Sequence, residues 1–426
     1  MHPAATHGES LLAATLLQLI VIIAAARGAH LLLRRLGQPG VIGEILAGLM
    51  LGPSLFGALW PQLSDAVFKG PAGGAIGVIS QIGLILLMFQ IGSDFHFGHL
   101  ARTQHRKAVA AIAAASIAAP LCLGLCLGWW SAPVLAPGID SRVYCLFFAV
   151  AMAITAMPVL GRILREFDLT RTPLGVIAIS AAALNDVAGW ILLAAVSAIA
   201  TAQFSPQHMA LQLGGIAAFA ALLWSAGRPL VRRLLRHYPS SDGQVPSSLM
   251  AIVLALLFAA AVCTYQLGIF AIFGGFALGL LFHTHRSFVE AWRWQVGRFV
   301  LVFFLPIFFT YTGLRTNLLG LVTLSDWSWC AAILAVAAAG KLLPVYCAGR
   351  AAGLSREDAG VCGVLMNTRA LMELVVLNIG LDLGFIPPKV FTMLVIMAVT
   401  TTLMTAPLLR LIYRRNGQVL VSALEA

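Results

Sequence analysis

The feature that most constrains this chain is a series of apolar runs, each bounded by Gly, Pro or charged residues. A helix that crosses a bilayer needs about 20 mostly apolar residues, and its backbone polar groups must be bonded within the protein. The runs predict an all-α polytopic membrane protein of about 13 transmembrane helices. The expected spans are 11–33, 41–59, 75–92, 108–130, 143–164, 174–200, 209–230, 248–266, 270–282, 299–319, 327–348, 359–380 and 390–412.

Composition agrees with this fold class. The 426 residues are 60% hydrophobic and only 10% charged, whereas soluble domains carry about 25% charged residues. A net charge of +11 would suit a nucleic-acid-binding protein, but arginine in cytoplasmic loops explains it better in a membrane protein. The seven cysteines form no CxxC pair, so neither disulfides nor a thiolate metal site is expected.

The distribution of Lys and Arg predicts the orientation. With an odd number of spans the termini lie on opposite sides, and most of the 27 Lys and Arg residues fall on the side of the C-terminus. The other side carries Lys69, Arg142, Arg315 and Lys389. Because positive charge accumulates in cytoplasmic loops, we expect a multi-pass protein of the cell (inner) membrane with its N-terminus outside and its C-terminus in the cytoplasm.

Two pairs of short motifs indicate an internal repeat. AGLMLG (47–52) is matched by GGFALG (274–279), and TAMPVL (155–160) by NTRALM (367–372). The partners stand an odd number of spans apart, which inverts their orientation. Inverted repeats with two broken helices that cross at the midplane are typical of transporters, with the ion site at the crossing. The alternative is that small-residue motifs recur by chance in helix packing.

Asp186 is the main candidate for ion binding, because it lies near the middle of the run ISAAALNDVAGWILL (179–193). An ionisable residue at a helix centre costs roughly 2.5–3.5 kcal/mol on insertion. A carboxylate in a wet cavity holds a monovalent cation or a proton, but not both, and this competition is the minimal basis of exchange. Asn185 beside it is either a ligand or a structural cap for a broken helix. A buried acid satisfied by a helix neighbour is the alternative reading for Asp186.

Thr155 and Ala156 are expected to complete the ion-binding site. Pro158 removes a backbone donor and disfavours helix at Met157. An unwound segment would present carbonyls to the cation, and Thr155 adds a hydroxyl. Irregular backbone at membrane depth must line a cavity or be buried. The alternative is an ordinary proline kink.

The other charges at membrane depth have less direct roles. Lys341 is expected to compensate charge, or to snorkel to an interface. Arg369 and Glu373 are spaced for a structural ion pair on one helix. Glu44 is a candidate for the access path or a local backbone cap.

Four segments together resemble one protein family. They are AITAMPVLGRILREFDL (153–169), SAAALNDVAGWILLA (180–194), AGKLLPVY (339–346) and MNTRALMELVVLNIGLDLG (366–384). They are similar to the monovalent cation/proton antiporter family, second branch, which includes plant cation/proton exchangers and bacterial Kef-type and sodium/proton antiporters. The similarity runs in order across nearly the whole chain.

The resemblance implies the sodium/proton antiporter fold, a homodimer, and a core domain that moves against a dimer domain in an elevator-like way. On this division, 1–92 and 248–298 hold dimer-domain helices, 93–200 holds core helices, and 201–247 holds a linker helix and a basic cytoplasmic loop. Residues 299–415 hold the remaining helices, including the last core helices, and 416–426 form a short cytoplasmic tail. We expect no cytoplasmic nucleotide-binding domain in this chain.

Residue by residue, Asp186 matches the family's ion-binding aspartate, and Lys341 matches a lysine that pairs with a second acid. Asn185 stands where many electrogenic members have that acid, so the usual salt bridge cannot form. If Lys341 stays charged, one proton is exchanged for one cation. If it also releases a proton, the exchange is electrogenic, although the missing acid favours the first case.

The expected function is therefore secondary active exchange of Na⁺ or K⁺ for protons, with both ions competing at Asp186. The transported ions and membrane lipids are the expected partners, with no other cofactor and no nucleic acid. A gated potassium or cation efflux channel and a membrane sensor without transport are the alternatives. An enzyme is not expected, because the sequence shows neither a nucleophile with a partnered base nor a metal cluster such as HExxH.

Overall fold

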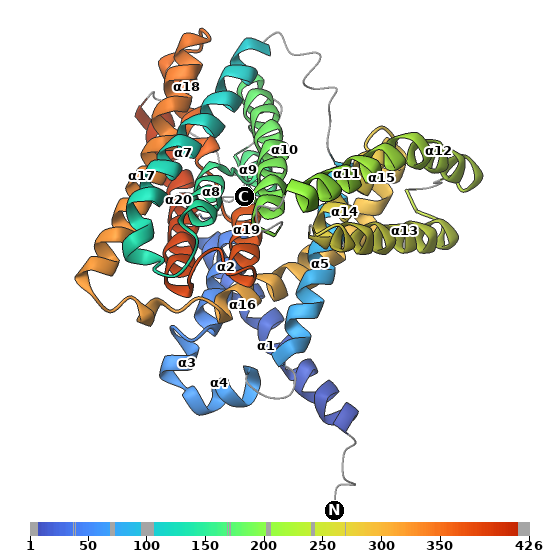
Figure 1. Ribbon diagram of the computed structural model, residues 1–426, viewed down its shortest axis with the longest axis horizontal. Coiled ribbons are helices and arrows are strands. Elements are labelled where there is room, and N and C mark those ends of the chain that lie inside the picture. The colour runs from blue at the N-terminus through green and yellow to red at the C-terminus, as the bar shows by residue number, and fades with distance from the viewer. Residues whose placement is uncertain are drawn as a thin grey trace, which may run out of the picture. The chain divides into compact units, whose positions relative to one another are not determined.

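A computed structural model of the chain describes residues 7–36, 38, 40–68, 73–94, 106–167, 169, 172–201, 206–239, 243–268 and 270–415 (Figure 1). Every regular element in these ranges is a helix, as the sequence predicts. Within the described residues, eleven helical segments are long and apolar enough to cross a membrane. The two other expected spans, 143–164 and 270–282, include shorter apolar helices at Ser141–Ala153 and Ala271–Phe282. The protein is thus an integral, multi-pass membrane protein.

The described chain divides into two compact units. The first comprises Met1–Ile23, Asp65–Phe97 and Ala194–Tyr311, and the second comprises Ala24–Ser64, Gly98–Leu193 and Thr312–Ala426. Helices α1 (His7–Arg35), α4 (Pro61–Phe68), α10 (Pro173–Thr201) and α16 (Leu305–Leu314) run from one unit into the other. The assignment of segments to a dimer domain and a core domain stays a prediction.

The first unit is built mainly from helices that lie within it. They are α5 (Gly73–Ser93), α11 (Pro206–Leu222), α12 (Arg228–His237), α13 (Ser247–Gln266), α14 (Ala271–Phe282) and α15 (Arg286–Trp292), with the π-helical segments η1 (Leu223–Gly227), η2 (Arg293–Gly297) and η3 (Val300–Phe304). Helix α14 packs against α5 and α13. A Cβ built on Gly279 of α14 would lie 2.2 Å from the Phe89 carbonyl oxygen of α5. Only glycine allows this approach, so the GGFALG motif serves helix packing.

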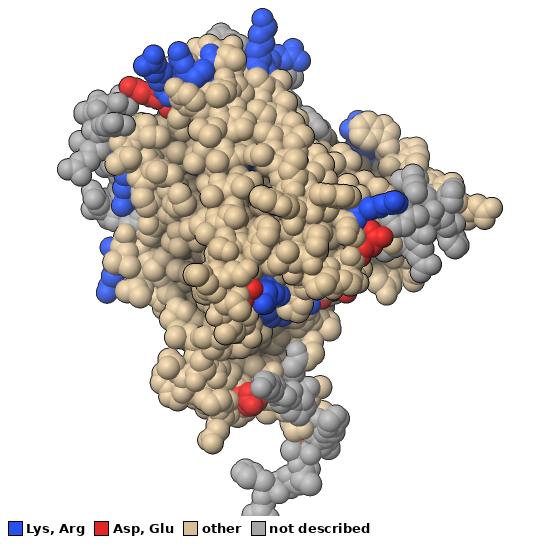
Figure 2. Space-filling view, turned by 60° about the vertical axis from the view of Figure 1, so that its left-hand side comes forward, with Lys and Arg blue, Asp and Glu red and all other residues tan. Residues whose placement is uncertain are grey.

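The second unit holds the two helix breaks that the sequence predicts. Its helices are α2 (Gly40–Leu51), α3 (Phe56–Leu59), α7 (Arg106–Leu135), α8 (Ser141–Ala153), α9 (Met157–Glu166), η4 (Leu318–Gly320), α17 (Leu324–Ala351), α18 (Arg356–Met366), α19 (Leu371–Asp382) and α20 (Pro388–Arg415). Helix α17 packs against α7, α18 and α20. In the view of Figure 2, Lys and Arg gather near the upper end, and most of the visible surface carries no charge.

The first break separates α8 from α9 at residues 154–156 and begins earlier than the sequence indicates. Met157, where Pro158 was expected to disfavour helix, is the first residue of α9. A proline is tolerated in the first turn of a helix, where its missing N–H would have no partner in any case. Pro158 therefore lies in the first turn of the new helix and does not kink an old one. The second break, residues 367–370, separates α18 from α19.

Candidate functional site

The two breaks bond directly to each other in the second unit. The Ala156 N–H donates to the Thr368 carbonyl at 3.0 Å, and Thr155 Oγ1 donates to the Met366 carbonyl at 3.0 Å. Thr155, Ala156 and Thr368 are buried. The crossing therefore satisfies some of the backbone groups that each break frees from its helix, as membrane depth requires.

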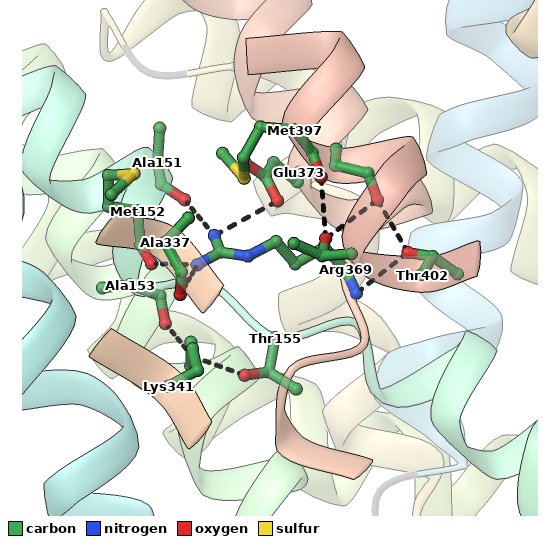
Figure 3. A network of polar contacts seen from close by, with 12 residues as sticks. Ala151, Met152, Ala153, Thr155, Ala337, Lys341, Arg369, Glu373, Met397 and Thr402 are labelled. Atoms are coloured by element: carbon green, nitrogen blue, oxygen red, sulfur yellow. Dashed lines mark hydrogen bonds and ion pairs between the residues drawn. The ribbon is translucent and has the colours of Figure 1, made fainter. Parts of the chain in front are cut away.

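Two buried basic side chains bind the carbonyl end of α8 (Figure 3). Lys341 Nζ donates to the Ala153 carbonyl and to Thr155 Oγ1, both at 2.6 Å. The Arg369 guanidinium donates to the Ala151 carbonyl at 3.2 Å and to the Met152 carbonyl at 2.8 Å. The last carbonyls of a helix lack partners within it and carry partial negative charge. Lys341 and Arg369 supply the donors, and the Arg369 guanidinium also supplies the opposite charge.

Asn185 holds the start of the first break in place. Its Oδ1 accepts from the Thr155 N–H at 2.8 Å. Its Nδ2 donates to the Ala153 carbonyl at 3.2 Å and to Ser116 Oγ of α7 at 3.1 Å. Both ends of the amide are thus engaged with the protein. Of the two roles expected for Asn185, this geometry fits the structural cap.

Asp186 differs from its neighbour, because both of its oxygens are available. The residue is 3% exposed, and neither carboxylate oxygen forms a hydrogen bond that meets normal geometry with any part of the chain that the structure describes. The Met157 N–H, at the start of α9, and Lys341 are close enough to stabilise negative charge on it. A helix N-terminus favours an anion. The carboxylate of Asp186 therefore keeps acceptor capacity that no hydrogen bond within the described chain uses.

Arg369 and Glu373 are completely buried, and they contact each other on one side of the second break. The guanidinium lies 3.4 Å from Glu373 Oε2, the contact that their spacing predicts. Arg369 also donates its backbone N–H to Thr402 Oγ1 of α20 at 3.2 Å. Glu373 lies in the first turn of α19, where an anion is favoured. The pair therefore links the second break to α8 and α20.

The second break also contains a strained residue. Ala370 has a φ of 73° and a ψ of −113°, a conformation that favours glycine. Among the described residues it is the one non-glycine residue with a positive φ. Such backbone costs on the order of 1–3 kcal/mol and persists where the surroundings impose it. Here the neighbouring residue Arg369 is fixed by its backbone N–H, which binds Thr402 of α20, and by its guanidinium, which binds the carbonyl end of α8.

Glu44 lies away from these contacts, in α2. It is 8% exposed, and its Oε1 is 2.8 Å from His30 Nδ1 of α1. This buried pair belongs to the second unit. The carboxylate of Glu44 thus contacts α1, and its role in an access path stays a prediction.

Sequence reasoning missed several groups that the structure places at the site. Ser116 and Thr402 stand in runs of small or apolar residues, where a hydroxyl gives no distinctive pattern. The carbonyls of Ala151, Met152 and Ala153 have no sequence signal at all, because any residue has a carbonyl. Outside the crossing, the His30 partner of Glu44 was also missed, although a histidine inside the first apolar run is a visible signal.

The formal charges of the site balance when all four are ionised. Asp186 and Glu373 oppose Lys341 and Arg369, each at most 3% exposed. Replacing a proton on Asp186 by a monovalent cation leaves the total charge of the site unchanged, so neither loaded form carries a larger uncompensated charge than the other. Both oxygens of Asp186 lack a hydrogen-bond partner among the described residues, whereas Glu373 lacks one only at Oε1, so a metal cation or a proton is best accommodated at Asp186. In the described residues no cluster of three or more His, Cys, Asp or Glu could hold a metal.

Comparison with known proteins bears on what such a site is for. Residues 19–411 match the family model described as "Sodium/hydrogen exchanger, transmembrane". The chain is 39% identical over 401 residues to the Na⁺/H⁺ antiporter NhaS4 of Synechocystis sp., an alignment that covers 93% of this chain and 97% of that protein. It is 33% identical to cation/H⁺ antiporter 17 of Arabidopsis thaliana and 29% identical to K⁺/H⁺ antiporter 1 of Saccharomyces cerevisiae.

The alignments with the plant and yeast proteins cover 95% and 97% of this chain but only 49% and 48% of those proteins. The chain thus spans about half the length of these relatives. Among solved structures, the sodium proton antiporter MjNhaP1 of Methanocaldococcus jannaschii matches with a TM-score of 0.63 and 15% identity. That match covers 93% of this chain and 95% of that structure. It confirms the fold that the sequence predicts.

Proposed function

The chain belongs to the sodium/hydrogen exchanger family, and from this premise we propose that it exchanges Na⁺ or K⁺ for protons across the membrane. The observation that carries the proposal is the buried Asp186 carboxylate, whose two oxygens lack hydrogen-bond partners among the described residues. The relatives named as sodium, potassium and cation/proton antiporters support the same exchange. The family is one of transporters, and no observation favours a channel or a sensor.

Competition at one carboxylate is sufficient for coupled exchange. A cation needs the charged form of Asp186, and a proton removes that charge. Either ligand adds one positive charge to the site, so the two loaded forms have the same total charge and differ only in which ion occupies Asp186. Thr155 and Ala156 are the proposed contributions of the unwound segment to the ion site, while Asn185 holds that segment in shape.

Alternating access by an elevator-like movement, and a homodimer, belong to the proposal. The crossing and Asp186 lie wholly within one of the two compact units, an arrangement that allows a site to move as a rigid part. From the distribution of Lys and Arg we also propose the cell (inner) membrane, with the N-terminus outside and the C-terminus in the cytoplasm. Na⁺ or K⁺ and protons are then the substrates, and membrane lipids surround the helices.

The competition makes a quantitative prediction for proteoliposomes that carry the purified chain. Where protons already occupy most of the sites, each unit of pH decrease is expected to raise the half-saturating cation concentration about tenfold, by mass action. The maximal rate at saturating cation should change much less. The measurement is proton flux, followed with a pH-sensitive dye, on addition of Na⁺, K⁺ or Li⁺. Cation flux that is not accompanied by proton movement would instead indicate a channel.

Lys341 bears on the electrical character of the exchange. Its ammonium is bound by the Ala153 carbonyl and Thr155 Oγ1, so it has acceptors that do not depend on the ion bound at Asp186. We therefore expect Lys341 to stay charged and one proton to be exchanged for one cation. An electroneutral cycle does not gain the roughly 2.3 kcal/mol per charge that 100 mV supplies. A clamped potential of either sign should leave the proton flux unchanged, and a strong dependence on voltage would contradict this stoichiometry.

A further inference from the structure

A second pocket lies in the first unit, apart from the crossing. Its volume is about 350 Å³, and it lies between α12 and the start of α15. Arg232, Leu235 and Arg236 line it from α12, and His285, Ser287 and Phe288 line it from the other side. The lining thus includes three basic side chains, the hydroxyl of Ser287 and the apolar side chains of Leu235 and Phe288. No role in ion exchange has been assigned to any of them.

The helical periodicity of α12 explains why two arginines share the pocket. Arg232, Leu235 and Arg236 are three and four residues apart, so they lie on one face of the helix. Arg233 is next to Arg232 in sequence but about 100° away around the helix, and it does not line the pocket. Val231 is the buried residue of this helix. The helix formed by RPLVRRLLRH therefore places Arg232 and Arg236 in the pocket lining, whereas Arg233 lies outside it.

The pocket has a positive electrostatic potential. No carboxylate among the residues that the structure describes forms an ion pair with Arg232 or Arg236. Burial lowers the pKa of His285, and the Coulombic effects of Arg232 and His283 lower it further. The Arg232 contribution reflects positive charge beside the pocket, which favours an anion. Arginine suits phosphate in particular, because its planar fork donates two parallel hydrogen bonds.

Two Trp–Arg contacts indicate that the pocket lies at the membrane interface. The Arg228 guanidinium is 3.3 Å from the centre of the Trp224 ring, and the Arg298 guanidinium is 4.4 Å from that of Trp294. Both tryptophans are more than 60% exposed, and exposed Trp is enriched at headgroup level. Trp224 precedes Arg232 in sequence and follows the apolar start of the span Gly214–His237. Trp294 follows Phe288 and precedes the span Val300–Gly320. Lipid headgroups are therefore within reach of the pocket.

We propose that this pocket binds a phosphate-bearing anion, and that its place at the interface makes the headgroup of an anionic phospholipid the ligand. Arg232 and Arg236 donate to the phosphate oxygens, and Ser287 Oγ is a further donor on the opposite wall. Leu235 and Phe288 contact the apolar part of the lipid next to the headgroup. Basic pockets beside membrane spans are suited to anionic lipids in this way. The inference does not depend on which ion the crossing transports.

The test titrates the purified full chain in detergent with phosphatidylglycerol and counts the bound lipids by native mass spectrometry. Arg232→Gln and Arg236→Gln are each expected to weaken binding about tenfold, the loss of one charge-assisted hydrogen bond. Arg233→Gln is the matched control, because it removes the same charge from an exposed position on the same helix. It should retain affinity close to that of the unmodified chain. Phosphatidylcholine should bind more weakly than phosphatidylglycerol, because its choline is cationic.

A second arm separates the two sources of phosphate. Inorganic phosphate is added to lipid-free protein, and the thermal unfolding midpoint is recorded. A phosphate-induced increase that is absent in Arg232→Gln, with no tighter binding of phosphatidylglycerol, would keep the phosphate site but identify free phosphate as its ligand. Equal losses in Arg232→Gln and Arg233→Gln, or equal binding of both lipids, would overturn the proposal. If either pocket variant unfolds early without ligand, Ser287→Ala provides the same comparison at an exposed position.

Discussion

Asp186→Asn is expected to reduce cation-dependent proton exchange to the rate of protein-free vesicles. The amide has nearly the shape of the carboxylate, but it can neither release a proton nor neutralise a cation. Both oxygens of Asp186 lack a hydrogen-bond partner among the described residues, whereas Glu373 is engaged with Arg369. The measurement is proton flux in proteoliposomes on addition of Na⁺ or K⁺ over a range of pH.

The loss must come from chemistry and not from unfolding. Asp186 forms no hydrogen bond among the described residues that the amide would lose, so the thermal unfolding midpoint of Asp186→Asn in detergent should stay close to that of the unmodified chain. Glu290→Gln, an acid-to-amide change at an exposed position of α15, is the matched control and should retain full exchange. Exchange that survives in Asp186→Asn would exclude the competition mechanism.

Arg369→Met is expected to cause the largest loss of stability of any single change at the crossing. The guanidinium is completely buried and binds Glu373 and the Ala151 and Met152 carbonyls. Methionine fills much of the volume but leaves Glu373 as an uncompensated buried charge and frees the end of α8. Breaking a buried ion pair in this way costs about 3–5 kcal/mol. The measurement is the unfolding free energy in a mixed-detergent titration, or the thermal midpoint where unfolding is irreversible.

A double-mutant cycle separates the ion pair from the carbonyl contacts. Glu373→Gln removes the partner charge, so the double variant Arg369→Met/Glu373→Gln should be less destabilised than the sum of the single changes, with a coupling of about 0.5–3 kcal/mol. The destabilisation by Arg369→Met that remains in the Glu373→Gln background measures the contacts of Arg369 with the carbonyls of α8. Arg286→Gln, an exposed arginine of α15, should change stability little. Strict additivity in the cycle would show that the ion pair does not contribute.

Much of this site was accessible from residue types and spacing. Hydrocarbon penalises ionisable groups so strongly that a short list of charges at membrane depth is already a list of candidates, and Asp186, Lys341, Arg369 and Glu373 all lie in the second unit. The Thr155–Ala156 segment is unwound as expected, although the break precedes Met157. The resemblance across nearly the whole chain identified the family, which the family model and the relatives then confirmed.

Other features depend on which segments meet in space. Asn185 was open to two roles until its amide was seen between Thr155, Ala153 and Ser116. The partners of Lys341 and Arg369 are largely backbone carbonyls, and a carbonyl has no identity in a sequence. The His30–Glu44 pair and the pocket between α12 and α15 join side chains from separate helices in the same way.

By itself, the sequence determined the membrane class, the candidate spans and the acid at membrane depth, because hydrophobic burial and the cost of a charge in lipid act on residue type alone. Tertiary structure decided which acceptors each cation uses, that Asn185 is engaged while Asp186 is not, and where two arginines of one helix face a pocket. Hydrogen bonds act over about 3 Å with narrow angles, so their partners are set only when distant segments are brought to their final positions.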